Sequence, residues 1–216
     1  MLFIQTLFVS PFIFLMTCLI VVFSVCLHEY FHAKAAVHEG DYTAAEHLTL
    51  NPLRQMGFMS LLMLAFFGIA WGAVPVDRGL LRSRWSMLRV SLAGPAANLL
   101  LLLLAWCILL IQGLPSVQKA LFSASQSVAA SVYLFTAMFG IYNFVLLVFN
   151  LIPMPGLDGW HILSAVFPKI QNIHSEFIKG AMLLVMLLAF FCVNILFAAG
   201  SFIMMLAPRL AWSIGG

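Results

Sequence analysis

The stretch that decides the fold is PFIFLMTCLIVVFSVCLHEYFH, residues 11–32. Residues 1–27 carry no charged side chain, and about 20 apolar residues are enough for a helix to cross a bilayer core. On a helix, residues four apart share a face, so His28 and His32 can bind one metal ion with Glu29 beside them as a base. Ionisable groups inside a membrane are usually functional, so the stretch predicts a hydrolytic metal site; the alternative is a helix end whose polar groups reach the interface without a metal.

The composition is that of an integral membrane protein. Hydrophobic residues make up 64% of the 216 residues and charged residues 8%, with a mean hydropathy of +1.10, which excludes ordinary soluble domains. We predict an all-α, polytopic helical bundle that forms a single unit over residues 1–216, with a core at about 7–165 and a C-terminal transmembrane segment at about 178–207. The long uncharged stretches are residues 1–27, 90–111, 120–157 and 180–208.

The short apolar segment 58–71 could either cross the membrane or re-enter it. It has about 14 residues between Gly57 and Gly72, which is short for a full crossing and favours a re-entrant hairpin. A re-entrant course leaves most cations on one side, which the positive-inside rule makes the cytoplasm. Those cations are Lys34, Arg54, Arg78, Arg82, Arg84, Arg89, Lys169 and Lys179, with Lys119 and Arg209 opposite.

Two short pieces beside this segment have the alternation of strands. Leu48-Thr49-Leu50 is followed by the turn signal Asn51-Pro52, and Ala73–Val76 carries a proline suited to a sheet edge. We expect the first piece to belong to a loop or short hairpin at the membrane surface and the second to be a short strand, and either edge could pair with an extended substrate.

A third metal ligand is predicted at the end of the next long apolar stretch. The sequence from Asn150 to Gly159 contains two prolines and a lone carboxylate, Asp158, at a helix break. An unpaired carboxylate is strongly disfavoured there, and a metal would give it a partner. Two imidazoles, one carboxylate and a water match catalytic rather than structural zinc; capping of the following helix is the alternative role for Asp158.

Three motifs occur in one order: His28 to His32, Gly94-Pro95-Ala96-Ala97-Asn98, and Asn150 to Gly159. Together they resemble the site-2 protease family of intramembrane zinc metalloproteases, over residues of about 25 to 165. The resemblance is to compact bacterial members that lack a PDZ domain, and it implies three core transmembrane helices with flanking helices. It also implies one zinc ion per chain, bound by His28, His32 and Asp158, with Glu29 catalytic.

Two asparagines lie on apolar helices, where an amide needs hydrogen-bond partners. In this family similar asparagines face the substrate or the transition state, which suggests supporting roles for Asn150 and Asn98. For Asn150, helix-to-helix hydrogen bonding is an equal alternative to an oxyanion donor. For Asn98, packing beside Gly94 is favoured. The other histidines, His38, His47, His161 and His174, are not predicted ligands, although His161 follows Asp158 closely enough to support it.

The resemblance implies an endopeptidase that cuts membrane-tethered proteins in or next to a transmembrane segment, after trimming by an upstream protease or under a regulatory partner. We expect a bacterial inner membrane location, a site open to the cytoplasm and no nucleic-acid partner. A metal transporter is the alternative, but residues 90–111 and 120–150 contain no His, Asp or Glu to supply its path. A catalytically silent binding protein is a further alternative.

Overall fold

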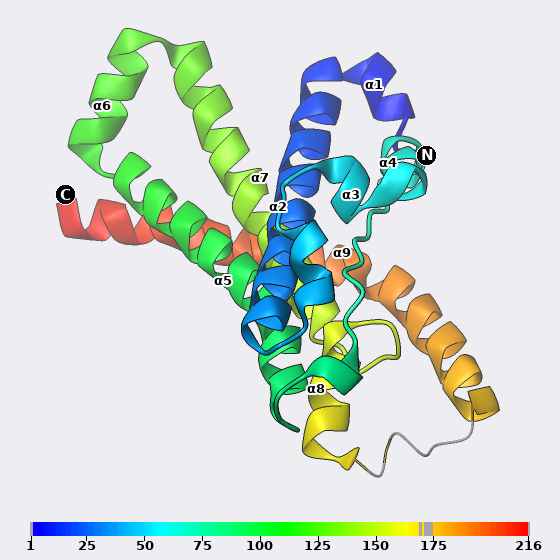
Figure 1. The fold of residues 1–216 in the computed structure, drawn as a ribbon. Helices are drawn as coiled ribbons and strands as arrows, with labels where there is room; N and C mark the ends of the chain where they lie inside the picture. Colours follow the sequence, from blue (N-terminus) through cyan, green and yellow to red (C-terminus); the bar gives the residue numbers. More distant parts are fainter. Residues whose placement is uncertain (1, 169, 171–174, 216) are drawn as a thin grey trace.

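The computed structural model describes residues 2–168, 170 and 175–215, and shows a bundle of helices without a strand among those residues. Three complete helices are long and apolar enough to cross a membrane: α2 (Pro11–His38), α5 (Ser86–Gln112) and α7 (Gln126–Asn150). A fourth such stretch, Cys192–Ser213, belongs to α9 (Ser175–Gly215). The predicted all-α polytopic membrane protein is therefore confirmed (Figure 1).

The first uncharged stretch forms two helices. A short α1 (Gln5–Val9) is followed by Ser10 in an extended conformation, and α2 begins at Pro11, where a proline fits because the first helical amide has no partner. The end of α2 at His38 is fixed by Gly40, whose φ of +112° stops the helical turn. The motif His28 to His32 thus lies in the last three turns of α2.

The segment after α2 leaves the end of this helix and returns to it. Its parts are η1 (Tyr42–His47), α3 (Pro52–Gln55) and α4 (Gly57–Phe67). The Asp77 amide donates to the Asp41 carboxylate over 2.7 Å, and the Arg82 amide donates to the Glu39 carbonyl over 2.9 Å. The 11 residues of α4 cover roughly 16 Å, half of a bilayer core. The chain therefore leaves and returns at the same end of α2, while re-entry of this segment into the membrane stays a prediction.

Neither piece forms a strand: residues 48–50 adopt the loop alternative, and the short strand predicted at Ala73–Val76 is absent. After η1, the side-chain amide of Gln55 donates to the carbonyls of His47 (2.7 Å) and Thr49 (2.5 Å), so these groups are not available for a ladder with another strand. Residues 73–76 run without regular secondary structure, and the Ala73 amide donates to the Gln55 carbonyl over 3.1 Å. One buried polar side chain therefore replaces the hairpin that alternation suggested.

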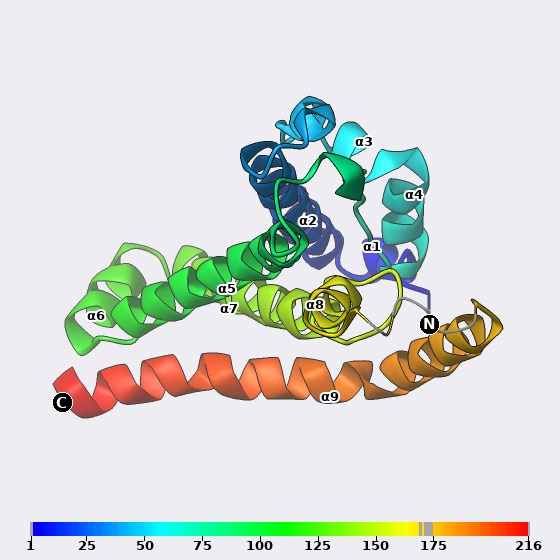
Figure 2. The ribbon, with the colours of Figure 1, turned by 60° about the horizontal axis from the view of Figure 1, so that its bottom comes forward.

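The long helices lie in layers. In Figure 2, α5 and α7 lie between α2 on one side and the long α9 on the other, in agreement with the contacts of α5 and α7 with both neighbours. The uncharged stretch that begins at residue 120 contains the end of one helix, α6 (Pro115–Ala124), and the whole of a second, α7. The break comes at Ser125, whose hydroxyl caps α7 by accepting from the Val128 amide.

Two short helices complete the end of the bundle where α2 finishes. They are η2 (Arg78–Leu80), between α4 and α5, and α8 (Asp158–Val166), which follows an irregular stretch after α7. Figure 1 places α8 at this end, while α6 and the C-terminus lie at the opposite one. The predicted C-terminal segment at 178–207 is part of the longer α9. Lys169 and His174 fall outside the described residues.

Candidate metal centre

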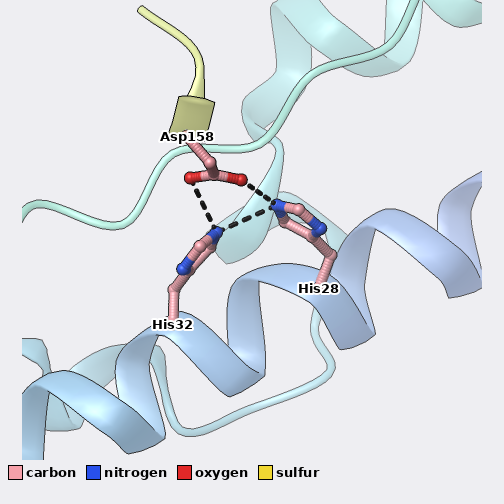
Figure 3. Close-up of side chains that lie close together, drawn as sticks. All are labelled: His28, His32 and Asp158. Carbon is pink, nitrogen blue, oxygen red and sulfur yellow. Dashed lines mark hydrogen bonds and ion pairs between the residues drawn. The ribbon is translucent and has the colours of Figure 1, made fainter. Parts of the chain in front are cut away.

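Three side chains from two helices converge at one point (Figure 3). The Nε2 atoms of His28 and His32 on α2 are 2.9 Å apart. Asp158 on α8 places its Oδ2 atom 3.1 Å from the Nε2 of His28 and its Oδ1 atom 3.1 Å from the Nε2 of His32. Both rings are buried, with 5% and 7% of their surfaces exposed. Donors about 2.0–2.1 Å from one zinc ion lie within roughly 4 Å of each other, so this set fits a single metal. Among the described residues it is the only group of three such side chains.

The far side of each imidazole settles which nitrogen faces the centre. The Nδ1–H of His32 donates to the Val90 carbonyl over 2.7 Å, and that of His28 donates to the Oδ1 atom of Asn98 over 2.5 Å. Both neutral rings therefore present Nε2 lone pairs to each other and to the Asp158 carboxylate. Asp158 Oδ2 is buried without a hydrogen-bond donor among the described residues. So many converging lone pairs require a cation between them.

The orientation of Asn98 is fixed by a buried chain of hydrogen bonds. Its amide donates to the Oδ1 atom of Asn143, whose own amide donates to the Phe139 carbonyl and to the Ser24 hydroxyl. A carbonyl can only accept, so each amide in the chain has one possible orientation. Asn98 and Asn143 are completely buried. The structure thus places Asn98 behind a predicted ligand, with its oxygen and its amide both occupied inside the protein.

Sequence reasoning missed Asn143 and Ser24. The available signal was an amide in the middle of an uncharged helix, which needs a partner in a membrane. Nothing in the sequence relates Asn143 to Asn98, 45 residues away, or to Ser24 on α2, because these contacts exist only once α2, α5 and α7 pack together.

Two glycines are required by close approach to the site. A methyl group on Gly94 of α5 would overlap the Nε2 atoms of both His28 and His32, and one on Gly72 would overlap the Glu29 side chain. Gly94 therefore lets α5 pass directly against the ligand face of α2. Gly72 likewise lets the chain between α4 and η2 pass directly against Glu29. The motif containing Gly94 drew attention to that residue, whereas Gly72 was noted only as a boundary of the short apolar segment.

A pocket of about 290 Å³ opens onto the three converging side chains. Glu29, which is 7% exposed, lines it together with the irregular segment 72–76. Asn150, the last residue of α7, also lines the pocket, and its amide donates to the Leu146 carbonyl over 3.1 Å. The structure therefore brings Glu29 and Asn150 into the same pocket as the candidate metal ligands, while Asn98 stays behind it.

Asp158 is positioned by the irregular turn that precedes α8. The cap residue of this helix is Leu157, and no side chain caps the helix, so the alternative role of Asp158 as a cap is not the observed one. Burial raises the pKa of the Asp158 carboxyl, but the His28 and His32 imidazoles, when they are protonated and donate hydrogen bonds to it, outweigh burial and lower it below its ordinary value. Asp158 is therefore a carboxylate at neutral pH, and a bound metal ion would take the place of those imidazole protons.

One turn beyond Asp158, His161 also lines the pocket. Its Nδ1 atom accepts a hydrogen bond of 2.7 Å from the Arg78 guanidinium. Burial and the charge of Arg78 lower the pKa of His161, so the ring is neutral. His38 and His47 do not belong to the metal-binding group.

Comparisons with known proteins agree with this geometry. Residues 16–193 match the sequence model of peptidase family M50. A Bacillus subtilis protein named "Putative zinc metalloprotease YwhC" is 32% identical over 160 residues, which are 72% of this chain and 69% of that protein. No solved structure matches the chain.

Two mycobacterial relatives are matched over a smaller share of their own length. "Putative zinc metalloprotease Rip2" of Mycolicibacterium smegmatis is 37% identical over 149 residues, and its Mycobacterium tuberculosis namesake is 34% identical. The chain spans about half of these relatives, 53% of each. The extent of the family match decides the assignment: this chain belongs to peptidase family M50, the site-2 protease family that its three motifs resemble, and is a zinc metallopeptidase.

Proposed function

We propose that this protein is an intramembrane endopeptidase that hydrolyses peptide bonds in or next to the transmembrane segments of membrane-tethered proteins. The observation that carries the proposal is the position of His28, Glu29 and His32, which lie within the apolar helix α2 and line a pocket. A peptide bond that reaches these residues must lie at the depth of the end of a membrane helix. A metal transporter is less well supported, because α5 and α7 carry no His, Asp or Glu along which a metal could move.

In the proposed reaction, His28, His32 and Asp158 hold the zinc ion and Glu29 moves the protons. Zinc in such a site supplies a more acidic water and polarises the carbonyl of the scissile bond. Glu29 accepts a proton as the water oxygen bonds to the carbonyl carbon, and donates it to the amine nitrogen as the C–N bond breaks. Asn150, which lines the same pocket, is proposed to contact the substrate or the developing oxyanion.

A helical substrate must unwind before it can be cut, because helical amides and carbonyls are already paired. The irregular segment 73–76 lines the pocket and has backbone groups outside any sheet or helix. We propose that an unwound stretch of substrate bonds to this segment as an added strand would.

The orientation in the membrane is proposed from the cations. Arg78, Arg82, Arg84 and Arg89 lie in η2, at the start of α5 and between them, at the end of the bundle that holds α8, whereas Lys119 is on α6 at the other end (Figure 1). By the positive-inside rule the pocket would open to the cytoplasm of a bacterial inner membrane. A membrane-tethered substrate already trimmed by another protease, or presented by a regulatory partner, would be the natural input.

The decisive experiment combines metal content with cleavage. Wild type, His28→Ala, Asp158→Ala and Glu29→Gln are purified in detergent, their zinc is measured, and each is mixed with a membrane-tethered test substrate. We expect zinc near one per chain in wild type and Glu29→Gln, loss of zinc in both ligand variants, and cleavage by wild type alone. Zinc in the wild type without Glu29-dependent cleavage of any tethered substrate would contradict the endopeptidase proposal.

A further inference from the structure

The pocket at the metal site shares lining residues with a second cavity that is rich in positive charge. This second cavity, of about 280 Å³, is lined by residues from η2, the start of α5 and α8. Arg78, Met87 and His161 line both cavities, so these three residues form the boundary between them. A peptide that extends from the metal site past this boundary enters the second cavity.

The boundary presents hydrogen-bond donors only. An arginine cannot accept, so the bond between Arg78 and His161 requires His161 to accept through Nδ1 and to carry its proton on Nε2. Arg78 uses one N–H group in this bond and retains four others. Arg84, which lines the second cavity beyond the boundary, adds a second guanidinium. This arrangement of donors and positive charge is complementary to a carboxylate.

These two arginines lack the carboxylate partners that Arg54 and Arg89 have, and Arg84 lies instead over the ring of Trp85, 4.5 Å from its centroid. Arg54 pairs with Glu46 and Arg89 with Glu39, at 2.7 and 3.0 Å. Within the described residues no ion pair joins Arg78 or Arg84 to a carboxylate, and neither cavity wall contains an acidic side chain other than Glu29 and Asp158 at the metal site. Arg78 and Arg84 are thus available to bind an anion from outside the chain.

We propose that Arg78, His161 and Arg84 bind an acidic side chain of the substrate, so that the enzyme prefers substrates with an Asp or Glu close to the scissile bond. This rests on the proposed endopeptidase function. His161 lies three residues after Asp158 on α8, and such side chains are about 5–6 Å apart on a helix. An extended peptide advances about 3.3 Å per residue, so the acidic side chain belongs within about three residues of the cut.

The test is a charge exchange between enzyme and substrate. A tethered substrate that wild type cleaves in a Glu29-dependent manner is prepared in matched versions, with Glu, Gln or Lys at each of the three positions on either side of the cut. We expect kcat/KM for the best Glu version to exceed that of its Gln version about tenfold. Arg78→Glu should lose this preference and cleave the Lys version at least as well as the Glu version.

Two controls separate recognition from folding and general charge. Arg82→Gln removes a charge from the same loop, but Arg82 lines neither cavity, so its Glu preference should equal that of wild type. Arg84→Gln should reduce the preference partially. Zinc content measured on each variant shows that the metal site is intact. If Arg78→Glu lost activity on every substrate alike, without any gain on the Lys version relative to the Glu version, a structural role would replace the proposed one.

The remaining outcomes are also decisive. Equal, Glu29-dependent cleavage of the Glu, Gln and Lys versions by wild type would overturn the inference and leave the proposed function intact. Cleavage that ignores substrate charge but changes with anionic phospholipid in nanodiscs, and loses that dependence in Arg78→Glu, would assign the arginines to a lipid headgroup. An absence of Glu29-dependent cleavage from every substrate would overturn the proposed function and this inference together.

Discussion

The two walls of the metal-site pocket are built in opposite ways. The wall made by α2, α5 and α7 is helical, and its polar groups are joined from His28 through Asn98 and Asn143 to Ser24. The facing wall consists of residues 72–76 and the turn before Asp158, which have no regular structure. The helical wall fixes its reactive groups in advance, whereas the irregular wall has backbone outside any helix or sheet, to which we propose that a peptide bonds.

The largest effect should come from adding a methyl group where α5 contacts His28 and His32. In Gly94→Ala the added methyl group overlaps both ligand nitrogens, so we expect zinc content to fall below about one tenth of wild type. Metal analysis of the purified protein measures this. Gly180→Ala is a matched control, because nothing lies within 4 Å of a methyl group there. Normal zinc in Gly94→Ala would show that the helical wall yields more easily than its packing indicates.

The corresponding change in the irregular wall should spare the metal. A methyl group on Gly72 overlaps the Glu29 side chain and not the ligands. We expect Gly72→Ala to keep its zinc and to lose about a hundredfold in kcat, because a displaced general base contributes on the order of 10²–10⁴. The measurements are kcat, compared with that of Glu29→Gln, and the zinc content of the purified Gly72→Ala variant. Loss of zinc from Gly72→Ala would mean that the two walls are not independent.

Breaking the buried chain should weaken the metal site without destroying it. Asn98→Leu removes the acceptor that orients His28, and loss of such a partner lowers metal affinity about 10- to 100-fold. Asn143→Leu acts one step further away and should have a smaller effect. Competition with a chelator measures both affinities. Thr136→Val, which removes a different bond between α5 and α7, should leave zinc affinity unchanged; an equal loss there would indicate general helix packing.

The smallest effect concerns the contact between the end of α2 and the start of α5. The Ser86 hydroxyl and the Arg89 guanidinium hydrogen-bond to the Glu39 carboxylate, lowering its pKa. A lowered pKa stabilises the fold above the unfolded value of about 4.3, and this stabilisation disappears as pH falls through the folded value. Glu39→Gln should therefore be about 1 kcal/mol less stable at pH 7.

Thermal unfolding in detergent across pH measures this difference. We expect the gap between wild type and Glu39→Gln to close as the solution is acidified below the folded pKa of Glu39. A gap that stayed constant down to acid pH would assign the effect to packing and not to the carboxylate charge.

The sequence predicted the features of this protein that depend on local spacing. Two histidines four residues apart must share a helix face, and long uncharged stretches must form membrane helices, because both follow from the period and rise of one helix. The motif around Asp158 indicated the third ligand in the same way, through a carboxylate at a helix break. The short strand at Ala73–Val76 was predicted wrongly, and at residues 48–50 the alternation did not reveal that Gln55 occupies the carbonyls of His47 and Thr49.

What only the tertiary structure decided are the contacts between distant segments. The chain that follows the short helix α4 returns to the end of α2, where the Asp77 amide donates to Asp41, 36 residues away. The orientation of His28 depends on Asn98, 70 residues away, and the charged boundary depends on Arg78 meeting His161 across 83 residues. Helical periodicity determines which face a residue occupies, but which faces meet depends on how whole helices pack, and no local pattern in one sequence encodes that.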